Sequence, residues 1–182
     1  MFQSARNPAQ QPDPFNPYQR QILDQANQLL AQGKPGQAAL MFAEIAEVVN
    51  TNHPQRAANL HAQAAHAFAD DHQGPAALIQ ARAALNLFIK NKMVQRTPVF
   101  YANITRKLNS KGMENIANVL IGEFSSRVGS ISPTTTASVT QKHGLLPTNC
   151  PKCGGPIHGE EAKWVDSHTA ECEYCGSLIR SE

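Results

Sequence analysis

Six amphipathic stretches follow one another between residues 17 and 124, and they restrict the chain to a mainly α-helical fold. In each stretch apolar residues recur every three or four positions, which is the period of a helix with one buried face. Signals that end a helix separate most of the stretches: Gly33-Lys34-Pro35-Gly36, Asn52-His53-Pro54, His72-Gln73-Gly74-Pro75 and Lys111-Gly112. We therefore expect six helices joined by short turns.

The helices are expected to pair as αα-hairpins, because a short sequence recurs. Gly36-Gln37-Ala38-Ala39-Leu40 returns thirty-eight residues later as Gly74-Pro75-Ala76-Ala77-Leu78, with a fainter echo one period further on. The first unit, Ala31-Gln32-Gly33 leading to Phe42, resembles the turn and second helix of a tetratricopeptide repeat. This resemblance implies stacked hairpins that present a surface to a peptide or protein. A plain helical bundle is the alternative.

All four cysteines lie near the C-terminus, in two C-x-x-C-G pairs separated by eighteen residues. This spacing is typical of a four-thiolate zinc site, in which the sulfurs surround the metal at about 2.3 Å. We predict one structural Zn²⁺ held by Cys150, Cys153, Cys172 and Cys175, with no position left for a catalytic water. Two structural disulfides are the alternative. They are disfavoured because residues 1–6 do not have the apolar character of a secretory leader.

The segment from Cys150 to Ile179, with its paired knuckles, resembles a zinc ribbon. The resemblance implies a small antiparallel β sheet whose folding is coupled to metal binding. His158 and His168 lie between the knuckles, but four cysteines already complete the tetrahedron, so neither histidine is predicted as a ligand. Zinc ribbons serve in nucleic-acid machinery, in protein docking and as structural staples, so the resemblance does not select a function. The apolar residues expected to pack together in the sheet are Trp164, Ile157, Leu178 and Ile179.

Composition divides the 182-residue chain into four segments. Residues 1–16 are rich in proline and amides, which predicts a disordered tail. Residues 17–124 form the helical-repeat domain, residues 125–147 a flexible linker rich in Ser and Thr, and residues 148–182 the ribbon. No apolar run is long enough to span a membrane, and reduced thiolates suit a reducing compartment, so we expect a cytoplasmic protein without a membrane partner.

Charge is distributed unevenly along the chain. The net charge is +2, but from Cys150 onward three basic residues face six acidic ones, which gives −3 there and +5 elsewhere. No acidic residue lies between Asp71 and Glu114. This stretch is either an ordinary solvated face or a surface for an acidic partner, for which nucleic acid and the chain's own ribbon are the two candidates. The basic residues concerned are Arg82, Lys90, Lys92, Arg96, Arg106, Lys107 and Lys111.

The sequence contains no nucleophile elbow, phosphate-binding glycine loop or HExxH motif, so we expect no enzyme and no catalytic residues. Asp70-Asp71-His72 falls at a turn, where polar residues are ordinary, and His61 and His66 do not share a helix face as a metal pair would. The favoured interpretation is a protein-interaction adaptor. Its repeats would bind a protein or peptide, and its ribbon would serve as a second contact or regulatory module.

Two other functions stay open. The first is a nucleic-acid-associated, transcription-type factor, which the acidic ribbon disfavours because phosphate contacts need Lys and Arg. The second is a zinc-thiolate redox sensor, in which oxidation of the thiolates releases the metal. The sequence does not indicate an oligomeric state.

Overall fold

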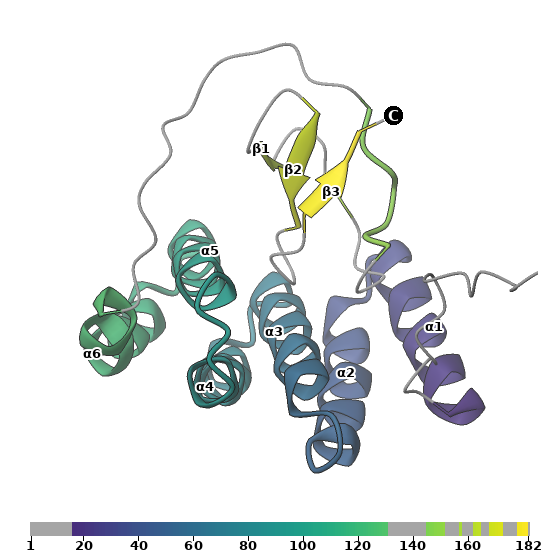
Figure 1. Ribbon diagram of the computed structural model, residues 1–182, viewed down its shortest axis with the longest axis horizontal. Coiled ribbons are helices and arrows are strands. Elements are labelled where there is room, and N and C mark those ends of the chain that lie inside the picture. Colours follow the sequence, from purple (N-terminus) through teal and green to yellow (C-terminus); the bar gives the residue numbers. More distant parts are fainter. Residues whose placement is uncertain are drawn as a thin grey trace, which may run out of the picture.

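The computed structural model describes residues 16–130, 145–151, 157, 162–164, 168–172 and 178–181. Within these residues the chain is mainly α-helical, with a small antiparallel sheet near the C-terminus, as the sequence predicts (Figure 1). The predicted tail before Asn16 and residues 131–144 of the predicted linker lie outside the described residues. The elements are α1 (Pro17–Ala31), α2 (Pro35–Val49), α3 (Pro54–Asp70), α4 (Gly74–Lys90), α5 (Arg96–Ser110), α6 (Glu114–Gly129), β1 (Lys163–Trp164), β2 (Thr169–Glu171) and β3 (Leu178–Arg180).

Helix ends follow the sequence signals closely. Proline occupies one of the first two positions of α1, α2, α3 and α4, where its missing N–H costs no hydrogen bond. Four turns pass through a left-handed residue just after the helix. At each of them an amide reaches back five residues to close the last turn, for example from Gln73 N to Phe68 O at 2.9 Å. The left-handed residues are Gly33, His72, Lys92 and Gly112.

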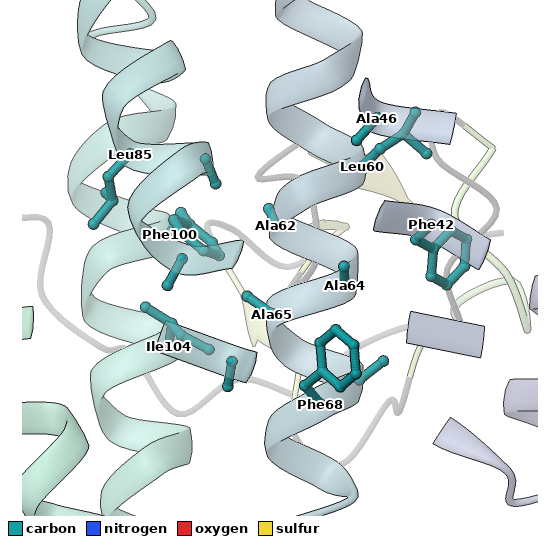
Figure 2. Close-up of a cluster of buried hydrophobic side chains, with 14 of the residues drawn as sticks. Phe42, Ala46, Leu60, Ala62, Ala64, Ala65, Phe68, Leu85, Phe100 and Ile104 are labelled. Carbon is teal, nitrogen blue, oxygen red and sulfur yellow. The ribbon is translucent and has the colours of Figure 1, made fainter. Parts of the chain in front are cut away.

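The central helix of the array is α3. Every residue from Leu60 to Ala69 is buried, which is possible because α2, α4 and α5 all pack against it. Five alanines in this run present only small side chains, so neighbouring helices approach closely on more than one side. Figure 2 shows Phe68 of α3 beside Phe42 of α2, and Ala65 of α3 on the side of Ile104. The core is therefore continuous across the array.

The helices stack in chain order, and the strongest contacts run from α1 through α4, followed by the pair α5 and α6. Buried positions in α2 recur in α4, but one residue later than the sequence repeat suggests: Ala38 corresponds to Ala77 and Val49 to Phe88. The thirty-eight-residue match of Gly36 with Gly74 is therefore out of register with the packing. The side of the helix on which a residue lies decides whether it is buried, and the local sequence match of the two glycines does not.

Helix α6 continues to Gly129, past the predicted domain boundary at Phe124. Val128 lies one helical turn beyond Phe124 and is buried in the same core. The start of the predicted linker is thus part of the helical array. None of the helices in the described part of the chain is both long and apolar enough to cross a membrane.

The small sheet has the order β1-β2-β3, and both pairings are antiparallel. The register places Trp164 opposite Ala170, and Ala170 opposite Ile179, so these three residues share one face. Ala170 and Ile179 are buried, and Ile157 packs against the same cluster. Leu178 lies on the other face and is exposed, so its predicted place in the core is wrong. Alternation along β3 allows only one of two neighbours to face inward.

Candidate functional site

One cysteine from each predicted knuckle lies in the core beside the sheet. Cys150 and Cys172 are 2% and 1% exposed, and they share a buried cluster with Ile179. The chain around the first knuckle is held by a hydrogen bond from Ile157 N to Thr148 O at 2.9 Å. The second buried cysteine directly follows β2. Cys153 and Cys175 lie outside the described residues.

These two cysteines fit the role of metal ligands. They lie twenty-two positions apart in the sequence, yet the fold brings both into one small buried cluster. Among the residues that the structure describes, the cluster holds Cys150, Cys172 and Ile179 with Leu146 and Ile157 packed against them, and a structural zinc is one means of stabilising a small core. His168, which is not among the predicted ligands, is exposed, and His158 lies outside the described residues.

A second feature is a polar seam beside α5, which we define by the polar residues spaced three or four apart on the face of α3 that carries Asn59, His66 and Asp70. At one end of the seam Arg96 donates to Asn59 Oδ1 at 2.9 Å. In the middle the ring of His66 meets Phe100 edge to face, with centroids 5.5 Å apart. At the other end the Asp70 carboxylate faces both Lys107 and Lys111, with nitrogen–oxygen distances of 3.0 and 3.4 Å. The α3 members of the seam are Arg56, Asn59, Gln63, His66 and Asp70.

The seam is a structural feature that the sequence analysis did not identify. Its members are spaced three, four, three and four residues apart, which places them on one face of α3. The signal was present as a polar stripe on an otherwise alanine-rich helix. The apolar periodicity of the sequence alone does not reveal this polar stripe.

The basic stretch does not form an acid-free surface in three dimensions. Lys107 and Lys111 pair with Asp70, and Arg82 forms a two-point ion pair with Glu123 of α6, one contact of which measures 2.7 Å. The hydrogen bond with Arg82 lowers the pKa of Glu123, and the same bond raises the pKa of Arg82. Acids that are distant in sequence thus neutralise much of this stretch. Lys90 and Lys92 remain exposed.

The two histidines of α3, His61 and His66, contact different helices, as their five-residue spacing implies. His61 is buried, its Nδ1 lies 2.7 Å from Gln80 Oε1 of α4, and its Nε2 lies 3.9 Å from Glu47 of α2. His66 is buried against Phe100 of α5. Both are therefore packing residues on opposite sides of α3, and the structure does not bring them together.

The Asp70-Asp71-His72 turn has a structural role in the array. Asp70 belongs to the seam, and the Asp71 carboxylate accepts from Gln73 Nε2 at 2.5 Å and lies against Gly36 at the start of α2. His72 takes the left-handed conformation that ends α3.

Comparison of the chain with protein-family models, with curated proteins and with solved structures finds no match.

Proposed function

We propose that this chain is a zinc-binding protein-interaction adaptor. The helical array would bind a protein or peptide, and the C-terminal zinc ribbon would act as a second contact or regulatory module. The observation that carries the proposal is the polar seam. The seam has two buried polar side chains, Gln63 and His66, and three half-buried ones, Arg56, Asn59 and Asp70, at positions where apolar residues would stabilise a core at least as well. A role in recognising a partner would explain why polar residues are found on this face of α3.

The metal part of the proposal rests on the convergence of Cys150 and Cys172 in one buried cluster. We assign the zinc to these two residues together with Cys153 and Cys175. Four thiolates around one Zn²⁺ form a closed site, which stabilises the ribbon and leaves no position for substrate. Because the thiolates must stay reduced, we place the protein in the cytoplasm.

The nucleic-acid alternative loses support from the ion pairs of the basic stretch. Lys107, Lys111 and Arg82 each face a carboxylate of this chain, so fewer cations remain for phosphates. A protein or peptide partner needs fewer charges, because apolar and hydrogen-bonding contacts contribute to its affinity.

Site-specific photo-cross-linking tests the adaptor proposal. A benzophenone side chain is placed at Gln55, which is exposed beside the seam at the start of α3, or at Leu40 on the outer face of α2. We expect a discrete cross-linked protein from Gln55 in cell extract and none in common with Leu40. Cross-linking of the same proteins from both positions would contradict the proposal, because it would show no preference for the seam.

A further inference from the structure

The second helix of each hairpin exposes an apolar side chain at the same position. The fourth residue of α2, of α4 and of α6 is a buried alanine. Two residues beyond that alanine each helix carries an exposed apolar residue, and these are Leu40, Ile79 and Val119, which are 63%, 60% and 43% exposed. Exposed apolar residues that are scattered singly over a surface need no explanation. These three recur at one position of successive hairpins, so they form a row on the surface of the array.

On α2 this position belongs to a stripe that combines apolar and acidic side chains. Leu40, Glu44 and Val48 are spaced four residues apart and therefore lie on one face of the helix. Glu47, three residues after Glu44, lies on the same face. All four residues are exposed, and α2 contains no basic residue. The stripe is therefore apolar and negatively charged.

The two carboxylates of this stripe are not neutralised by the rest of the described chain. Among the residues that the structure describes, Glu44 forms no ion pair, and Glu47 meets only Nε2 of His61, at 3.9 Å. Nδ1 of the same ring lies 2.7 Å from Gln80 Oε1 of α4. The imidazole thus reaches from the α2 stripe to the residue that follows Ile79, which places Ile79 at the edge of the stripe.

We propose that an acidic–apolar face, defined by Leu40, Glu44, Glu47, Val48 and Ile79, binds a basic peptide segment of a partner protein. Apolar side chains of that segment cover the three apolar residues of the face, and its Lys or Arg side chains pair with the two carboxylates. The face lies on α2 and α4, whereas the polar seam lies on α3 beside α5. The inference therefore goes beyond the proposed adaptor function and adds a second surface with a different partner.

A basic peptide fits this face better than other occupants do. Two carboxylates repel the phosphates of nucleic acid and the anionic headgroups of a membrane. A second copy of the chain fits poorly as well, because a two-fold contact places the same patch of both copies face to face. Glu44 and Glu47 of the two copies would then oppose each other, and like charges across an interface are costly.

Fluorescence anisotropy on the full zinc-loaded chain tests the proposal. The probe is a fluorescein-labelled peptide Leu-Lys-Lys-Leu-Ala-Lys-Lys-Leu-Ala-Lys. One control peptide carries Glu in place of every Lys, and the other carries Ser in place of every Leu. We expect the probe to bind at least about tenfold more tightly than either control, because the face offers both apolar area and negative charge.

The apolar contribution is tested by the double variant Leu40→Ser/Ile79→Ser. It should weaken binding of the probe at least about tenfold, because two apolar side chains no longer become buried in the complex. Val94→Ser/Leu178→Ser is the matched control, since these two residues are 55% and 61% exposed and lie outside the face. This control should change the affinity less than about twofold.

The acidic contribution is tested by Glu44→Gln/Glu47→Gln. At low salt this variant should bind the probe about fivefold more weakly than the wild type, and high salt should remove the difference. Asp24→Asn/Glu114→Gln removes two negative charges at exposed positions of α1 and α6 and should change the affinity less than about twofold. All four variants alter exposed side chains, so each should keep the helical circular dichroism spectrum of the wild type.

Equal binding of the three peptides, no binding of the probe at millimolar concentration, or equal effects of the face and control variants would overturn the proposal. Self-association in sedimentation equilibrium that Leu40→Ser/Ile79→Ser abolishes would assign the face to a second copy instead. Binding to vesicles of phosphatidylserine that the same variant abolishes would assign it to a membrane. Gln55 lies outside this face, so a seam cross-link that persists while the peptide result is negative would show that the acidic–apolar face alone is wrong.

Discussion

The carboxylate of Asp70, the last residue of α3, accepts a hydrogen bond from Lys107 Nζ of α5 at 3.0 Å. The side chains of Asp70 and Lys107 are 26% and 15% exposed, so water screens the attraction between them only in part. The pair joins two adjacent hairpins, although Asp70 and Lys107 are thirty-seven residues apart in the sequence.

Replacement of Asp70 by Asn should therefore destabilise the array. It removes the negative partner of both Lys107 and Lys111, and we expect the free energy of unfolding to fall by roughly 1–2 kcal/mol. Urea denaturation followed by circular dichroism measures the change. Asp24→Asn, an exposed position on α1, serves as the matched control. A double-mutant cycle with Lys107→Gln should return a coupling energy clearly above zero, and additive single effects would contradict the ion pair.

The Arg82–Glu123 pair predicts a pH-dependent effect. Because the folded pKa of Glu123 is lowered, its contribution to stability is present above the unfolded glutamate pKa and disappears as pH falls through the folded pKa. Glu123→Gln should therefore melt at a lower temperature than the wild type at pH 7, and the difference should disappear as the pH falls through the folded pKa of Glu123. High salt at pH 7 should also bring the two melting temperatures together. A difference that does not depend on pH would exclude the ion pair as its cause.

Phe42 should be among the most sensitive positions of the array. The side chain is fully buried between α2 and α3, and Phe42→Ala leaves a cavity that helices cannot easily close. We expect a loss of about 3–5 kcal/mol in the free energy of unfolding. Leu40→Ala on the same helix, at a side chain 63% exposed, should cost less than about 0.5 kcal/mol. Similar values for the two variants would show that the packing of α2 is misassigned.

The metal site makes a separable prediction. Wild-type protein should contain one zinc per chain by elemental analysis, and Cys172→Ser should lose it. The helical circular dichroism signal should persist, because the buried cluster around Cys172 is distinct from the core of the helices. His168→Ala should retain the metal, since four cysteines complete the coordination. Zinc-free wild-type protein with a disulfide mass shift would refute the site.

The boundary of the array can be tested by truncation. A fragment of residues 17–130 should fold alone, with a strongly helical spectrum and a cooperative melt. A fragment that stops at Phe124 should be less stable by about 1.5–3 kcal/mol, because it loses the buried side chain of Val128. Equal stability of the two fragments would mean that the last turn of α6 contributes nothing to the core.

The helices could be predicted from the sequence because apolar period and stop signals agree at most of them. The end of α6 could not, since Ser125, Ser126 and Gly129 have the composition of a linker. The signal that mattered was the four-residue spacing of Leu120, Phe124 and Val128. Tertiary packing outweighs the weak helix propensities of serine and glycine at such a place.

The electrostatics were harder to predict than the helices. A segment without acids between Asp71 and Glu114 suggested an open basic surface, yet Asp70 and Glu123 lie just outside it and fold back onto its cations. Charge pairing depends on which helix faces are adjacent, and this is fixed by helix phase and hairpin order. The four cysteines were the opposite case, since their spacing alone identifies them as candidate zinc ligands without knowledge of the fold.

The turns of the array give it a direction along the chain. Gly36 at the start of α2 is covered by Asp71 and Gln73 from the next hairpin, and Gly74 at the start of α4 is covered by Met113 and Ile116 from the hairpin after that. The start of the second helix in one hairpin is thus the surface against which the turn of the next hairpin packs. Such a construction is extensible at one end: an additional hairpin inserted after α6, with its own turn placed over the start of that helix, would lengthen the array without altering the contacts that precede it.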